Sequence, residues 1–157
     1  MQGMVVGIFI CSRAGDPLNS VPSAFAVAGK GLQGDRYEMG TGVYSKLENK
    51  VRQVSIIASE AIIKANEGLI DRFLPGETRR NIIVGGISPE ELNKLVGKEF
   101  YIGCVRMRGA ELCHPCDRPS AITKKDDFRK AFQMRGGLLA EVLFDGPISV
   151  GDTLRWD

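Results

Sequence analysis

The chain has 157 residues and a formal net charge of +2, with 43% hydrophobic and 25% charged residues. This ordinary globular composition excludes a disordered chain, a collagen-like repeat and a coiled coil, and the length suits a single domain over 1–157. The longest apolar stretches, such as 54–58 and 138–144, are far too short to span a membrane. Nineteen glycines favour tight turns between short strands over a helical bundle.

The charge pattern limits the partners that we expect. The 21 basic and 19 acidic side chains nearly balance, whereas a nucleic-acid-binding surface needs a clearly basic face. No basic start followed by an apolar run opens the sequence, so we predict no secretory signal and expect a cytoplasmic location. Neither nucleic acid nor a membrane is an expected partner. Twelve of the basic residues are arginines, which suit bidentate capture of carboxylate or phosphate.

Short strands dominate the prediction in chain order. Segments rich in Val, Ile and aromatic residues predict seven or eight strands, at 3–11, 23–28, 52–58, 81–84, 99–103, 105–112, 138–144 and 153–156. Three short helices are expected: one beginning at Ser59, one from Ser88 to 95–96, and one over 126–134. Strands spaced this closely leave no room for repeated βαβ units. The sequence therefore predicts a mainly β fold, a β-barrel or strongly curved sheet with a few short peripheral helices.

Between the strands, two segments stand out as irregular. Residues 28–36 contain three glycines, which allow positive φ angles and close approach of the backbone. Residues 37–50 are polar and aperiodic, with glycines at 40 and 42, and are predicted to form a long surface loop. We expect this loop to act as a mobile flap over a ligand pocket, with a plain surface loop as the alternative. Residues 146–147 predict a turn.

The segment with the most chemistry holds two of the four cysteines and the single histidine of the chain. Cys113 and Cys116 lie three residues apart, with His114 between them. Four interpretations are open: two buried thiols, part of a zinc site, a thioredoxin-like redox pair, or one reactive thiolate. A zinc site wants two more soft ligands, and the sequence has no second CxxC. A redox pair needs a helix start, and Pro119 is expected to separate the cysteines from the next helix.

A single reactive thiolate at Cys116 is the favoured interpretation. Arg118 lies two residues beyond it, and a nearby cation stabilises thiolate over thiol. A thiolate can attack sulfur, carry a persulfide or bind a soft metal such as molybdenum. Cys113 is expected to be buried and inert at a strand end. Cys11 and Cys104 are expected within apolar strands, where both should be dispensable.

Several short motifs, taken in their order and spacing, resemble one family. They are Gly31-Leu-Gln-Gly-Asp-Arg36, Arg-Gln-Val-Ser-Ile-Ile at 52–57, Thr-Arg-Arg-Asn-Ile at 78–82, Pro115-Cys116, Arg135-Gly-Gly137 and Gly146-Pro-Ile-Ser-Val-Gly-Asp152. Each motif alone is weak, but together they resemble the MOSC family, the C-terminal domain type of molybdenum cofactor sulfurases. The resemblance covers residues 20–157.

This resemblance implies a barrel-like fold and an essential cysteine that matches Cys116, which would hold a persulfide or bind molybdenum directly. It also implies residues that would bind the molybdenum cofactor (molybdopterin), through its phosphate or pterin: Arg79, Asn81, His114, Arg36 and Asp35. We expect Arg118, the cation near Cys116, to bind the cofactor with them. Of these, Arg79 would meet the phosphate or pterin and Asn81 would brace the same loop. We therefore expect Arg79 and Cys116 to share one pocket.

The implied function is that of a stand-alone MOSC domain that binds the molybdenum cofactor, carries sulfur through Cys116, or does both. One alternative is a small molybdenum-dependent reductase of N-hydroxylated substrates, and a second is a CxxC thiol–disulfide protein. Because large relatives carry a pyridoxal-phosphate desulfurase domain that this chain does not show, no pyridoxal phosphate is expected. Sulfur would then come from an external donor of the cysteine desulfurase type, with a molybdoenzyme or redox protein as the other expected partner.

Overall fold

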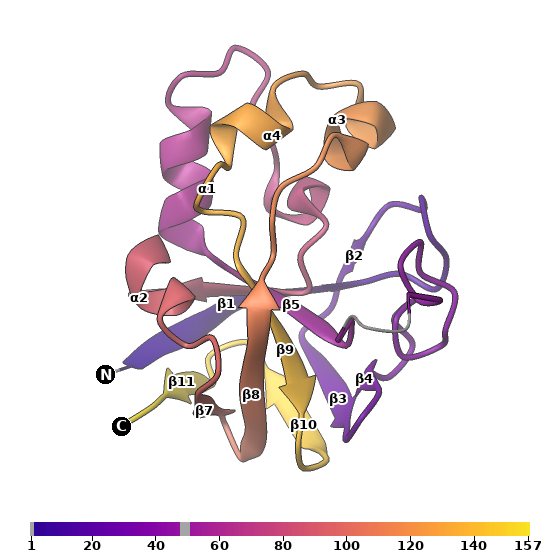
Figure 1. Cartoon of the computed structure of the whole chain (residues 1–157), viewed down its shortest axis with the longest axis vertical. Helices are drawn as coiled ribbons and strands as arrows, with labels where there is room; N and C mark the ends of the chain where they lie inside the picture. The colour runs from indigo at the N-terminus through magenta and orange to yellow at the C-terminus, as the bar shows by residue number, and fades with distance from the viewer. Residues whose placement is uncertain (1, 48–50) are drawn as a thin grey trace.

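The computed structural model describes residues 2–47 and 51–157. These residues form eleven strands, four α-helices and one short 3-10 helix, so the predicted mainly β fold is confirmed. Seven strands close into a barrel (Figure 1). In their order around it they are β11 (Thr153–Arg155), β7 (Glu99–Ile102), β8 (Val105–Leu112), β9 (Leu138–Val142), β5 (Val54–Ala58), β6 (Ile82–Gly85) and β1 (Gln2–Ile10).

Pairing between the first and last strands closes the barrel. Gln2 of β1 pairs with Arg155 of β11, which also brings the two ends of the described chain together. β5 and β6 run parallel, and such a pair needs a crossover connection. That connection contains α1 (Ser59–Asn66) and η1 (Pro75–Thr78). β5 is buried along its whole length, as expected for a strand covered on both faces.

A small second sheet, β10-β3-β4, adds to the same hydrophobic core. It consists of β10 (Gly146–Ser149), β3 (Ser23–Val27) and β4 (Gly31–Leu32). The turn predicted at 146–147 is wrong, because these residues begin β10. Pro147 is tolerated there since β10 lies at the edge of its sheet. The two-residue strands β4 and β2 (Asn19–Ser20) are too short to show a periodic pattern.

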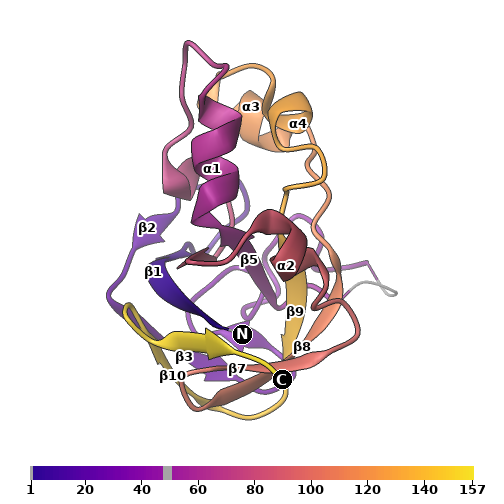
Figure 2. The same ribbon diagram turned by 90° about the vertical axis from the view of Figure 1, so that its left-hand side faces the viewer.

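The helices gather on one side of the barrel. In both views α1, α3 (Arg118–Thr123) and α4 (Phe128–Ala131) lie together above it, with the small sheet at the opposite end (Figures 1 and 2). Three aromatic rings join this layer: Phe73 meets Phe128 edge-on at a centroid distance of 5.2 Å, and Phe128 stacks on Phe132 at 4.5 Å. None of the helices in the described ranges is long and apolar enough to cross a membrane.

Local sequence signals explain the helix boundaries. The capping box predicted at Ser88 and Glu91 is present at the start of α2 (Pro89–Asn93). The helix predicted over 126–134 is shorter, because Asp127 has a left-handed conformation (φ 67°) and α4 begins after it. The expectation that Pro119 separates the cysteines from the next helix is wrong. Pro119 lies in the first turn of α3. A backbone N–H at this position would have no acceptor within the helix, so the N–H that proline lacks is not needed there.

Candidate functional site

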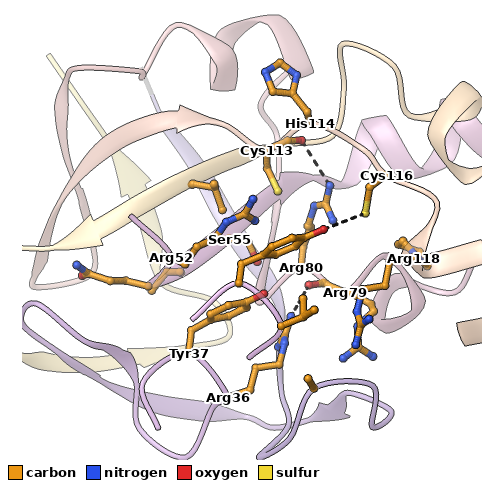
Figure 3. A pocket seen from close by; sticks show the side chains of 17 residues that line it. Arg36, Tyr37, Arg52, Ser55, Arg79, Arg80, Cys113, His114, Cys116 and Arg118 are labelled. Carbon is orange, nitrogen blue, oxygen red and sulfur yellow. Dashed lines mark hydrogen bonds between the residues drawn. The ribbon is translucent and has the colours of Figure 1, made fainter. Parts of the chain in front are cut away.

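A pocket of about 650 Å³, its open mouth included, lies where four segments flanking strands meet. The cysteine loop follows β8, the arginine pair precedes β6, Arg52 precedes β5, and residues 36–44 follow β4. Figure 3 shows these side chains converging. The lining residues are Ala14, Arg36, Tyr37, Val43, Tyr44, Arg52, Gln53, Val54, Ser55, Arg79, Arg80, Cys113, His114, Cys116, Arg118, Pro119 and Leu139. Arg79 and Cys116 therefore share one pocket, as predicted.

The two cysteines of the loop differ in accessibility. Cys113 is buried, and its backbone N–H donates to the carbonyl of Gly137 at 2.7 Å, which fixes the start of the loop. Cys116 is half-buried, so its thiol can be reached from the pocket. The hydroxyl of Tyr44 donates a long hydrogen bond to the Cys116 sulfur at 3.8 Å. The accessible sulfur of the pair is thus Cys116.

Tyr44 comes from the segment that we expected to cover the pocket. The guanidinium of Arg52 lies 4.4 Å from the centroid of its ring, a cation–π contact. The hydrogen bond to Cys116, followed by burial and by the charge of an ionised Cys116, raises the pKa of Tyr44 above its ordinary value. Tyr44 therefore stays protonated and keeps its donor near neutral pH. Residues 37–47 lie in the described range and 48–50 lie outside it, and the mobility of the flap stays a prediction.

Arg79 is held in place by an unusual backbone. It follows η1 in a left-handed conformation (φ 64°), which is rare for a residue with a side chain. Its Nη1 donates to the carbonyl of Asp16 at 2.6 Å, and its Nη2 to the sulfur of Cys11 at 3.8 Å. Burial, followed by the charge of Arg36, lowers the pKa of Arg79 from its ordinary value. Because a guanidinium stays protonated in proteins, this shift marks a crowded positive charge that an anion would relieve.

Arg80, the neighbouring arginine, serves as a brace. Its Nε donates to the carbonyl of Gly136 at 2.7 Å, and its Nη1 to that of Thr78 at 3.0 Å. Its Nη2 lies 3.4 Å from the carbonyl of Cys113. Only 6% of Arg80 is exposed, so the side chain ties the arginine turn to the cysteine loop.

Asp35 and Arg36 support the opposite wall. Asp35 is fully buried, pairs with Arg36 at 3.0 Å and accepts from the backbone N–H of Cys11. Arg36 also donates to the carbonyl of Arg79 at 3.1 Å. The expectation for Cys11 and Cys104 is wrong in its geometry. Cys11 follows β1 and contacts two pocket arginines, while Cys104 is exposed in the turn between β7 and β8.

Asn81 lies behind the pocket and does not line it. Its side-chain oxygen accepts from the N–H and the hydroxyl of Ser55, at 3.0 and 3.2 Å. Its side-chain nitrogen donates to the carbonyl of Phe9 at 3.1 Å. Asn81 thus fastens the arginine turn to β5 and β1.

His114 and Arg118 flank Cys116 along the chain. His114 is exposed at the rim, and its ring points away from the arginines (Figure 3). Arg118 is half-buried, and its charge contributes to the lowered pKa of Arg79. Among the hydrogen bonds of the described residues, none involves the guanidinium of Arg118, so its donors are available to a ligand.

Of the seven residues expected at the site, five line the pocket and two, Asp35 and Asn81, lie behind it. Sequence reasoning missed Arg52, Arg80, Tyr37 and Tyr44. Arg80 is next to Arg79 in the motif at 78–82, and Arg52 is the first residue of the motif at 52–57. Both could therefore have been identified as candidate site residues from these motifs. The tyrosines lie in an aperiodic loop and carried none.

The pocket is strongly cationic. Five arginines line it and no Asp or Glu does. Within residues 2–47 and 51–157, one pocket arginine forms an ion pair, that of Arg36 with Asp35. Within the same ranges no three His, Cys, Asp or Glu side chains cluster to hold a metal ion. The arrangement suits an anion placed beside a thiol.

Comparison with known proteins gives the family and the fold. A model of the MOSC domain matches residues 30–155. The YuaD protein from Bacillus subtilis is similar in structure, with a TM-score of 0.81 at 18% identity over 98% of this chain and 94% of that one. YiiM from Geobacillus stearothermophilus has a TM-score of 0.73 at 15% identity, over 97% and 73% of the two chains. YiiM from Escherichia coli has 0.70 at 16%, over 99% and 69%. No curated protein matches the chain significantly.

Proposed function

The chain belongs to the MOSC domain family, and from this membership we propose that it binds the molybdenum cofactor and carries sulfur through Cys116. One observation carries the proposal. An accessible thiol lies in a pocket with five arginines and no acidic side chain in its wall. Such a pocket favours an anionic ligand placed beside the thiol.

The donor set fits the cofactor. Its phosphate is the kind of group that arginine forks bind, and Arg79 and Arg118 would hold it. Cys116 is a soft ligand of the kind that molybdenum accepts. When bound, the cofactor would supply a metal centre for redox and ligand-exchange chemistry.

The residues of this chain have separable tasks in the proposal. Cys116 provides the nucleophilic sulfur, and Tyr44 orients that sulfur through its hydroxyl. Arg80 keeps the cysteine loop next to the arginine turn. Loading Cys116 with sulfur requires an external donor, for which a cysteine desulfurase with its substrate is the reference choice.

The test is the composition of protein purified without air from cells that make the cofactor. Molybdenum and cyanide-labile sulfur would be measured in the unmodified chain, in Cys116→Ser and in Cys104→Ser, whose thiol is exposed outside the pocket. We expect molybdenum or labile sulfur in the unmodified chain and in Cys104→Ser, and neither in Cys116→Ser. If Cys116→Ser keeps the full content of both, the proposal is wrong.

A further inference from the structure

The charge of the pocket points to the chemistry of the sulfur donor. Among the residues that the structure describes, the five guanidinium charges of the pocket, less the single carboxylate of Asp35, leave four positive charges. A thiolate compensates one of them. The remaining excess favours a donor that brings two negative charges of its own, because each added negative charge relieves repulsion among the buried guanidinium groups.

Arg118 and Arg79 offer the donors that such a ligand needs. Arg80 donates from all three of its side-chain nitrogens to backbone carbonyls, and Arg36 donates to Asp35 and the carbonyl of Arg79. The Nη atoms of Arg79 donate to Asp16 and Cys11, and its Nε has no acceptor among the described residues. Arg118 has no hydrogen-bond partner among the described residues, and its charge acts on Arg79. Arg118 also lies close to Gly15, because one of its side-chain nitrogens would be 3.7 Å from a Cβ atom added to that glycine. The next residue, Asp16, accepts the hydrogen bond from Arg79. The two guanidinium groups therefore lie near one another on the side of the pocket reached from Cys116.

Access to Cys116 also favours a small donor. The cysteine is half-buried, and Tyr44 lies against its sulfur. Arg52 stacks on the Tyr44 ring and holds it there. This arrangement favours a small donor inside the pocket over a cysteine on a partner protein, which would approach from outside it.

We propose that Cys116 takes its sulfur from a small S-sulfonate dianion, the class represented by thiosulfate, whose sulfonate group binds Arg118 and Arg79 when the cofactor phosphate does not occupy them. This proposal rests on the proposed sulfur-carrying role of Cys116. The Cys116 thiolate attacks the outer sulfur of thiosulfate. A new S–S bond forms to Cys116, and the S–S bond of thiosulfate breaks, with its electron pair leaving on sulfite. The products are the Cys116 persulfide anion and sulfite, so no further oxidant or reductant is needed.

The experiment compares two sulfur donors on the purified chain. Thiosulfate carries a sulfonate group, and inorganic polysulfide does not. Sulfite release is measured together with the mass gain at Cys116, located by peptide sequencing. The variant is Arg118→Gln, and the matched control is Arg129→Gln, which removes an exposed arginine that pairs with Asp117 outside the pocket. Thermal unfolding of each variant verifies its fold.

We expect thiosulfate to load Cys116 with release of one sulfite per sulfur transferred. Arg118→Gln should slow this loading about tenfold, since it removes charge-assisted hydrogen bonds to the sulfonate. Polysulfide is also an anion but has no sulfonate oxygens to accept hydrogen bonds, so its loading should fall in Arg118→Gln only by the electrostatic part of the effect and less than loading from thiosulfate does. Arg129→Gln should leave both reactions unchanged. Sulfate has the oxyanion but no sulfur to give, and it should inhibit loading from thiosulfate selectively.

The outcomes separate this inference from the proposed function. If polysulfide loads Cys116 but thiosulfate does not, the S-sulfonate donor is excluded and the sulfur-carrying role stands. If thiosulfate loads Arg118→Gln as fast as the unmodified chain and sulfate has no effect, the binding of the sulfonate by Arg118 and Arg79 is excluded, and the sulfur-carrying role again stands. If neither donor loads Cys116, the sulfur-carrying role fails and this inference fails with it.

Discussion

Two groups of arginines in this chain differ in what balances their charge. On the outer face of the barrel, Arg106 and Arg108 of β8 contact Glu99 of β7, and Arg108 also contacts Glu141 of β9 at 3.1 Å. In the pocket, five arginines share one carboxylate, that of Asp35, among the residues that the structure describes. The outer group is neutralised within the sheet and needs no ligand. The pocket group keeps an excess of positive charge, and we expect an anion to bind there.

The largest expected effect concerns Arg80, which supports the wall of the pocket. Arg80→Ala removes three hydrogen bonds to the buried carbonyls of Gly136, Thr78 and Cys113. We expect the free energy of unfolding to fall by about 3 kcal/mol, since each lost bond leaves an acceptor unsatisfied. Urea unfolding measures this change. Arg118→Ala is the control, and its effect should stay within about 0.5 kcal/mol. Equal losses in the two variants would show that Arg80 is not a brace.

A smaller effect tests whether the electrostatic potential at Cys116 in the pocket is more positive than at the exposed Cys104. Iodoacetate is anionic and iodoacetamide is neutral, so their relative alkylation rates at one cysteine report the local potential. We expect the ratio to favour iodoacetate at Cys116 compared with the exposed Cys104. Arg118→Gln should lower the ratio at Cys116 by about threefold, as expected for one charge removed nearby in a partly solvated site. Peptide mass spectrometry measures both rates. Equal ratios at the two cysteines would contradict a cationic pocket.

The smallest effect belongs to the outer group. The hydrogen bond from Arg106, opposed by partial desolvation and aided by Arg108, lowers the pKa of Glu99. A carboxylate with a lowered pKa stabilises the fold above its ordinary pKa, and this contribution is lost as pH falls through the folded value. Glu99→Gln should therefore lower the Tm slightly near neutral pH, as for other exposed pairs. The difference from the unmodified chain should shrink as the pH falls below the ordinary Glu pKa of about 4.3 and vanish once the pH is below the lowered pKa that Glu99 has in the folded chain. A difference that grows on acidification would have the wrong sign.

Much of the fold could be predicted because its signals are local. The strand β8 occupies the predicted range 105–112, and Ser88 with Glu91 forms the predicted cap. The closure of the barrel was expected in outline from the close spacing of the strands. The sequence did not predict the very short strands or the conformations that single residues set. One example is Asp127, whose left-handed conformation makes α4 begin at Phe128.

The site was predictable only where motif residues carry it. Arg79 and Cys116 lie 37 residues apart and still share the pocket, as the resemblance implied. The division of labour between Arg79 and Arg80 was not visible in the sequence, because it depends on the left-handed turn at Arg79. Tyr44 reaches Cys116 across 72 positions of sequence. No local pattern indicates such a contact, and only the folded chain shows it.

The central claim is that one thiol, Cys116, does the chemistry of the pocket. The most direct test is to load Cys116→Ser and Cys113→Ser with sulfur, from polysulfide and from a cysteine desulfurase with its substrate, and to record the mass of the peptide that holds residues 113–116, apart from that of the exposed Cys104. We predict that this peptide gains roughly 32 Da in Cys113→Ser, the mass of one sulfur atom added to a thiolate, and gains nothing in Cys116→Ser. Cys113 is buried and fixes the loop, so its loss should weaken loading without abolishing it. If Cys113→Ser loses the mass gain as completely as Cys116→Ser, the single-thiol account is contradicted and a two-cysteine thiol–disulfide reaction replaces it.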